Sequence, residues 1–148
     1  MEIQQCREIV EEVLRPLSWA LFLNNWDLTV VYGTLDPTTM ATCEPNEKYL
    51  RAKITIDPQK HESRSSVVDT IRHELLHCVL AEMDLFKASV KHWICAGSAE
   101  WAAVDEVYHH ALERMVNQLE SILGKAEATV RAGKVGCGRW NKAKGRKR

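Results

Sequence analysis

Three residues that could support metal-dependent hydrolysis stand in one short motif, His73-Glu74-Leu75-Leu76-His77. Around it, apolar residues recur at three- and four-residue steps from Val67 to Asp84 without Pro or Gly, which predicts an amphipathic helix. Residues four apart share one helix face, so His73 and His77 can aim two imidazole nitrogens at one point. A catalytic zinc takes such nitrogens together with a third protein ligand and a water. Glu74 lies about 100° round the helix, where its carboxylate can reach that water without binding the metal.

The motif is short, so its position in the chain matters as much as its residues for judging whether it binds a metal. Histidine is rare, at 6 of 148 residues, and chance would still place the motif in roughly two per cent of chains of this composition. Here it falls inside a helix among core-type residues, where two histidines and a glutamate are costly to bury without a role. The plainer alternative is a pair of hydrogen-bonded core histidines beside a solvated glutamate.

The third ligand must come from elsewhere, and a last helix is its expected source. We predict this helix from Ser98 to about Leu123, with Gly124 as its C-cap. An apolar stripe along it should face the body of the protein, and comprises Val104, Val107, Tyr108, Ala111, Met115, Leu119 and Ile122. Glu100 lies at the edge of this stripe, and we favour it as the third ligand. A carboxylate near a helix N-terminus is also favoured by the dipole alone.

Other residues remain open as the third ligand. Asp105 lies on the other flank of the stripe, while the opposite side of the helix carries Glu106, His110, Glu113 and Asn117. Asp105 and Glu106 are the main alternatives to Glu100. His92, His109 and His110 are further candidates, although surface histidines are common. Each acid, taken alone, is equally typical of a solvated helix surface.

Composition indicates one soluble domain. The chain is 45% hydrophobic and 27% charged, as globular proteins are, and has no apolar run long enough to span a membrane and no signal-peptide core. Its five cysteines are scattered, odd in number and without a C-x-x-C pair. This pattern favours a reducing compartment, so we expect a cytoplasmic protein without a disulfide framework.

The zero net charge conceals an uneven distribution. From Thr129 onward the chain has eight basic residues and no acidic one, which leaves the rest with an acidic excess. We therefore expect a folded domain over residues 1–124 and a basic, flexible tail over 125–148. Such a tail can contact nucleic acid weakly, although a solubilising end is the commoner role.

The remaining elements are predicted from periodicity and turn residues. A helix over residues 2–23 should kink or restart at Pro16. Ser66 and Asp69 resemble a capping box for the motif helix. The expected strands are 26–32, a weaker 38–43 and 49–56, and a linker should cover 85–97. The order predicts an α+β fold with an N-terminal helix, a small three-stranded antiparallel or mixed sheet, the motif helix and a long C-terminal helix.

This arrangement resembles the zincin metallopeptidases of the gluzincin type, in particular the minimal zincins of phages and prophages. The resemblance covers Trp26 to about Leu123 and is specific only in the five-residue motif. It implies a Zn²⁺ held by His73, His77 and Glu100, with Glu74 as the general base. It also implies that the strand 49–56 lines the cleft and pairs with substrate. The extended metzincin motif is absent, and no N-E-x-x-x-D stands at the third ligand.

We therefore expect a zinc-dependent metallopeptidase that hydrolyses protein or peptide substrates, without membrane contact, in a bacterial cytoplasm and with a phage or prophage origin. Tyr108 could donate a hydrogen bond to the oxyanion, but its place on the apolar stripe favours a core role. One alternative is a catalytically silent zincin-like binding module whose basic tail contacts nucleic acid. Another is a structural protein in which the motif is accidental.

Overall fold

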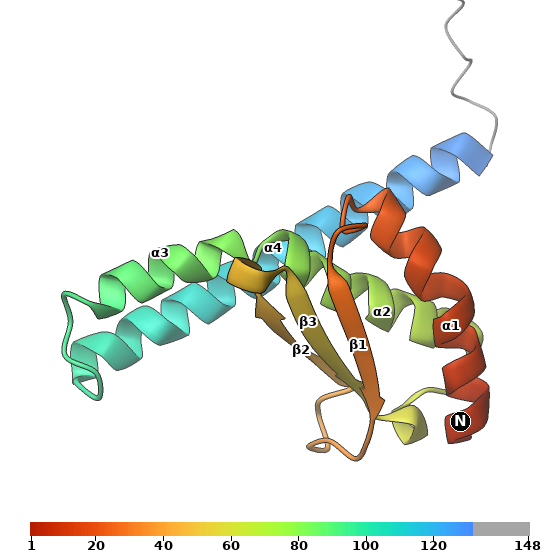
Figure 1. Cartoon of the computed structure of the whole chain (residues 1–148), viewed down its shortest axis with the longest axis horizontal. Helices are drawn as coiled ribbons and strands as arrows, with labels where there is room; N and C mark the ends of the chain where they lie inside the picture. The colour runs from red at the N-terminus through yellow and green to blue at the C-terminus, as the bar shows by residue number, and fades with distance from the viewer. Residues whose placement is uncertain (132–148) are drawn as a thin grey trace, which may run out of the picture.

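A computed structural model describes residues 1–131 of the chain, with side chains described through residue 126. Helices and a small sheet make up an α+β fold, as the sequence predicts (Figure 1). In chain order the elements are α1 (Ile3–Ala20), β1 (Asp27–Tyr32), β2 (Ala41–Asn46), β3 (Arg51–Ile56), α2 (Arg64–Val79), α3 (Glu82–Lys91) and α4 (Ala99–Arg131). Single 3-10 turns, Glu47–Tyr49 and Pro58–Lys60, flank β3.

The sheet is mixed, and its order is β1-β3-β2. β1 runs parallel to β3, with Asp27 opposite Arg51, and β2 runs antiparallel to β3 on the other side. β3 is therefore the central strand, and both of its edges are used by neighbouring strands. The expectation that β3 pairs with substrate is wrong for this reason. Within the described sheet, β2 is the strand on the cleft side that keeps an open edge.

The core lies between one face of the sheet and helices α1 and α2. Alternate residues of β3 are buried, while Arg51 and Lys53 on the other face are exposed, so the predicted half-buried strand is confirmed. The cluster on the buried face comprises Cys6, Ile9 and Val10 of α1, Ala52, Ile54 and Ile56 of β3, and Val67, Ile71, Leu75 and Cys78 of α2. The motif helix is thus fixed by its apolar side, which leaves the motif histidines on another side.

Several predicted boundaries are wrong. The helix N-cap of α2 is Ser63, whose hydroxyl accepts from the Ser66 amide at 3.2 Å, and no Ser66–Asp69 capping box forms. α1 continues through Pro16 as one helix. β2 includes Pro45, which suits an edge strand because a proline has no amide hydrogen to pair there. α4 continues through Gly124 to Arg131, since one glycine costs a helix only about 1 kcal/mol.

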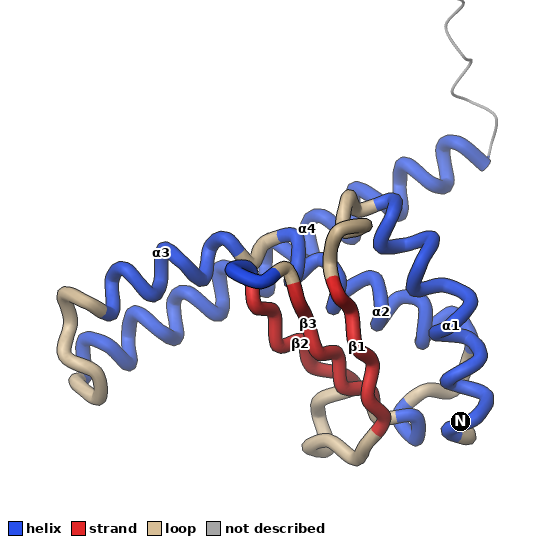
Figure 2. Tube along the Cα trace, in the orientation of Figure 1, coloured by secondary structure: helices blue, strands red, loops and turns tan. Residues whose placement is uncertain are grey.

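The expected linker over residues 85–97 is instead mostly helix α3, which begins with Glu82 and Asp84 in its first turn. α3 and the first half of α4 form a hairpin that projects to one side of the sheet (Figure 2). Tyr108 on α4 donates to Asp84 at 2.6 Å, and Lys87 on α3 pairs with Asp105 at 2.5 Å. These contacts join α3 to the first half of α4.

The C-terminal region and the possibility of a membrane-spanning helix complete the comparison with the predicted fold. The predicted tail over 125–148 lies largely outside the described residues, and the first of its residues belong to α4. Among the described helices, none combines the length and apolar character that a membrane crossing requires.

Candidate metal centre and catalytic site

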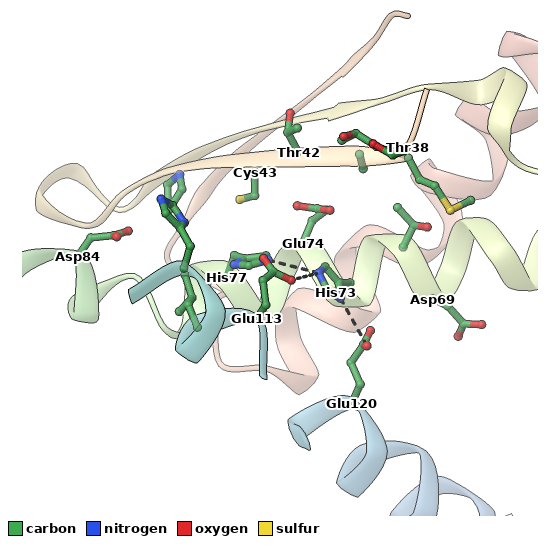
Figure 3. Close-up of a pocket in the computed structure, with 17 residues that line it drawn as sticks. Thr38, Thr42, Cys43, Asp69, His73, Glu74, His77, Asp84, Glu113 and Glu120 are labelled. Atoms are coloured by element: carbon green, nitrogen blue, oxygen red, sulfur yellow. Dashed lines mark hydrogen bonds and ion pairs between the residues drawn. The ribbon is translucent and has the colours of Figure 1, made fainter. Parts of the chain in front are cut away.

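The motif histidines and one carboxylate of α4 converge on a point in a cleft. His73 and His77 lie one turn apart on α2, and their Nε2 atoms are 3.3 Å from each other. Glu113 of α4 places one carboxylate oxygen 3.5 Å from His73 Nε2 and the other 3.3 Å from His77 Nε2. Figure 3 shows the three side chains pointing toward one another. Together they form a group that could hold a metal ion.

The structure does not bring Glu100, the favoured third ligand, to the histidines. Glu100 lies in the first turn of α4, about 20 Å along the helix from Glu113 at 1.5 Å per residue. Hydrogen bonds with its own backbone amide and with Ser98 lower the pKa of this carboxyl, as expected at a helix start. The carboxylate in the group is Glu113, which the stripe argument placed on the wrong side of the helix.

The alternative ligands are occupied elsewhere. Asp105 pairs with Lys87 across the α3–α4 hairpin at 2.5 Å. Glu106 is exposed beside His110, with 3.8 Å between their charged atoms. His109 borders the cleft but its Nε2 lies 3.2 Å from the Lys87 ammonium. His92 is exposed and makes an edge contact with Trp93.

Glu113 escaped prediction because α4 presents different faces to different neighbours along its length. Its first half packs on α3, while its middle crosses α2 through the face that carries Glu113, Val116 and Glu120. Val116 is fully buried, whereas Val107 on the expected stripe is 69% exposed. The signal available in the sequence was the spacing of Glu113, Val116 and Glu120, which share one helix face.

Glu120 is a second acidic residue that the sequence argument missed. Its carboxylate lies 3.4 Å from Nδ1 of His73, on the side of the ring opposite the Nε2 that faces His77 and Glu113. A carboxylate that accepts the Nδ1 hydrogen fixes the tautomer in which Nε2 is free to bind a metal. α4 therefore supplies both a candidate ligand and a residue that orients another ligand.

Glu74 lies beside the candidate metal group but is not one of its three residues. Its side chain points toward β2, and the residue is only 6% exposed (Figure 3). Burial raises the pKa of Glu74 from its ordinary 4.5 to about 7, with His73 opposing the rise. Burial lowers the pKa of His77, which favours the neutral imidazole that a metal requires.

The site opens into a cleft of about 700 Å³. α2 forms its floor, α4 contributes Glu113 and Glu120 on one side, and β2 with the preceding loop closes the other. The loop is held by Lys60, whose ammonium donates to the carbonyls of Leu35 at 3.0 Å and Thr39 at 2.6 Å and also to that of Asp36. Lys60 therefore ties the loop that precedes β2 to the 3-10 turn that follows β3.

Tyr108 does not reach the cleft as a free donor. Its hydroxyl donates to Asp84 at 2.6 Å, and burial together with this hydrogen bond raises the pKa of Tyr108. The core role that the sequence favours for Tyr108 agrees with its burial at 9% exposure.

Comparison with known proteins gave no match to a family model, a curated protein or a solved structure.

Proposed function

We propose that this protein is a zinc-dependent metallopeptidase whose metal ligands are His73, His77 and Glu113 and whose general base is Glu74. The observation that carries the proposal is the convergence of the three ligand atoms beside a buried glutamate in an open cleft. A core pair of histidines would not require a buried carboxylate next to them, because burial of such a group is unfavourable.

The donor set fits zinc in both type and spacing. Zinc bonds to histidine nitrogen and carboxylate oxygen at about 2.0–2.2 Å in a tetrahedron, so its ligand atoms stand about 3.3–3.6 Å apart. Here the two histidine Nε2 atoms are 3.3 Å apart, and Glu113 places one oxygen 3.3 Å from His77 Nε2 and its other oxygen 3.5 Å from His73 Nε2. One ligand atom from each of the three side chains lies within 4.8 Å of the other two. Three protein ligands leave one position open, as in catalytic rather than structural zinc sites.

The protein's own residues then account for the proton transfers. A zinc ion bound at this group would supply Lewis acidity and an acidified water. Glu74 accepts the proton of the attacking water, because its carboxylate stands next to the ligands without being one of them, and delivers it to the leaving amine. Glu120 keeps the His73 ring in its orientation throughout, through the 3.4 Å contact with Nδ1.

The cleft suits an extended peptide. β2 borders it and has an open edge, so a substrate backbone can add to the sheet there by main-chain hydrogen bonds. Pro45 cannot donate, which limits this pairing to the part of β2 that precedes it. The expected pairing of substrate with the sheet is kept in the proposal, but it moves from β3 to β2.

The cytoplasmic location and the phage or prophage origin belong to the same proposal. Weak nucleic-acid contact through residues 125–148, the basis of the silent binding-module alternative, concerns a segment mostly outside the described residues.

The proposal is tested with a proteome-derived peptide mixture, in which new termini are detected by mass spectrometry. Zinc-loaded wild type should generate new termini, and Glu74→Gln should keep its zinc but cleave about 10²–10⁴-fold more slowly. Glu106→Gln, a matched exposed glutamate on α4, should cleave as wild type does. Cleavage by Glu74→Gln at the wild-type rate would refute the assigned base. An absence of new termini with zinc-loaded wild type would refute the peptidase.

A further inference from the structure

Two free thiols face each other beside the candidate site. Cys43 extends from β2 and Cys78 from α2, and their sulfur atoms are 3.5 Å apart. Cys43 is partly exposed and borders the cleft, whereas Cys78 is buried and directly follows His77. The pair therefore links the wall of the cleft to its floor.

The pair does not belong to a second metal site. Over the part of the chain that the structure describes, the one group of three or more donor side chains that could hold an ion is His73, His77 and Glu113. A zinc site takes three or four protein ligands, whereas the other hydrogen bond of Cys78 goes to the Glu74 backbone carbonyl at 3.7 Å. Two isolated thiols at this separation are suited to oxidation instead.

We propose that Cys43 and Cys78 form a reversible disulfide, made by a hydroperoxide oxidant, that fastens β2 to α2 at the candidate site. Cys43 is the thiol that the oxidant reaches first, because it borders the open cleft. Its sulfur attacks the peroxide and forms a sulfenic acid with release of water or alcohol. Cys78 then attacks that sulfur, the sulfenic hydroxyl leaves as water with the proton of the Cys78 thiol, and the two thiols have together given two electrons to the peroxide.

The geometry requires a small movement. A disulfide holds its sulfurs at about 2.05 Å, so the present 3.5 Å must shorten by about 1.5 Å. α2 is fixed in the core, whereas β2 is an edge strand bonded to β3 alone, so β2 should supply most of the movement. The hydrogen bond with Cys78 and burial raise the pKa of the Cys43 thiol, so the oxidation should be slow.

The effect on activity rests on the proposed peptidase function. Moving β2 toward α2 narrows the cleft where an extended substrate would bind and pulls on the residue next to His77. A displacement of about 1 Å near a catalytic group can cost on the order of 10²-fold in rate. Oxidised protein should therefore cleave peptides at least about tenfold more slowly, and a dithiol reductant should restore the rate.

The bond itself is tested by peptide mapping, without any need for activity. Trypsin places Cys43 alone in residues 8–48 and Cys78 alone in residues 73–87, because Arg15 precedes a proline. After hydrogen peroxide treatment and alkylation, a non-reducing digest should contain these two peptides joined, lighter by two hydrogens. The joined peptide should persist in Cys95→Ser, which removes an exposed thiol, and be absent from Cys43→Ser and Cys78→Ser.

Three results would overturn the inference, and each is separate from failure of the peptidase. The disulfide would be refuted if the exposed Cys95 is oxidised while Cys43 and Cys78 can still be alkylated. It would also be refuted if Cys43 or Cys78 forms a disulfide with a different cysteine. If the joined peptide forms and the zinc-loaded protein cleaves at an unchanged rate, the regulatory role is refuted and the peptidase stands. If the joined peptide forms in a protein that never cleaves, the peptidase is refuted and the disulfide stands. Should Cys78→Ser fail to fold, Cys43→Ser alone decides the pairing.

Discussion

Replacing Glu74 with glutamine should stabilise the metal-free protein, because the wild type keeps a buried carboxylate at a cost. The pKa of Glu74 is raised by burial from 4.5 to about 7. A raised carboxyl pKa means that the unfolded chain ionises more readily than the folded one. Stability is therefore lost as the pH rises from 4.5 through 7, and the loss is complete above that range. It amounts to about 3 kcal/mol at pH 8, since each tenfold change in an equilibrium is about 1.4 kcal/mol.

The assay is urea unfolding of chelator-treated wild type and Glu74→Gln at pH 5 and at pH 8. Glu74→Gln should be more stable by about 3 kcal/mol at pH 8, and the difference should shrink toward zero at pH 5, where the wild-type carboxyl is protonated. Glu106→Gln, at an exposed position, should show no such pH-dependent gain. If Glu74→Gln is no more stable than wild type at pH 8, the Glu74 carboxylate is not held in a desolvated site. The raised pKa that supports its role as a general base would then be refuted.

Three further outcomes follow from neighbouring contacts. Glu120→Gln should weaken zinc binding by about tenfold in competition with a chromophoric chelator, because the 3.4 Å contact with His73 Nδ1 loses its charge, whereas Ser121→Ala should not. Lys60→Met should lower the free energy of unfolding in urea by about 2–3 kcal/mol, because the carbonyls of Leu35 and Thr39 lose a charged donor. Lys48→Met, at an exposed site, should have little effect on the free energy of unfolding, and equal effects of the two substitutions would contradict the role of Lys60. The backbone amide of Leu35 holds the pKa of Asp57 below its usual 3.8. Asp57 therefore adds stability that is present above pH 3.8 and is lost as the pH falls through its lowered folded pKa. Asp57→Asn should weaken this acid-side dependence of the free energy of unfolding on pH, and an unchanged dependence would refute the role of Asp57.

The sequence was most informative for elements that pack on the core through one face. β3 alternates cleanly because one of its faces is covered by α1 and α2, and the motif helix is apolar where it meets the same core. These local patterns predicted the α+β fold and placed His73, Glu74 and His77 on one helix. What they could not provide was the order of the strands. β3 reads as a half-buried strand whether it lies at the centre or at the edge, so its central place was not visible.

The prediction of Glu100 as the third ligand failed for a related reason. An apolar stripe predicts the buried face of a helix when one partner covers its whole length. α4 contacts α3 first and α2 later, so its buried face changes along the helix, and a polar side containing Glu113 meets the histidines. Helix α3 was missed because no Pro or Gly lies between Val79, where α2 ends, and Glu82, where α3 begins.

The most direct test of the central claim is zinc stoichiometry by elemental analysis of purified, zinc-reconstituted protein. Wild type, Glu74→Gln and Glu100→Ala should each contain about one zinc per chain, and His77→Ala and Glu113→Ala should contain far less. Glu106→Ala, an exposed acid on the same helix, controls for the loss of a charge from α4. Zinc lost with Glu100→Ala and retained with Glu113→Ala would contradict the ligand set, and wild type without zinc would contradict the metal centre itself.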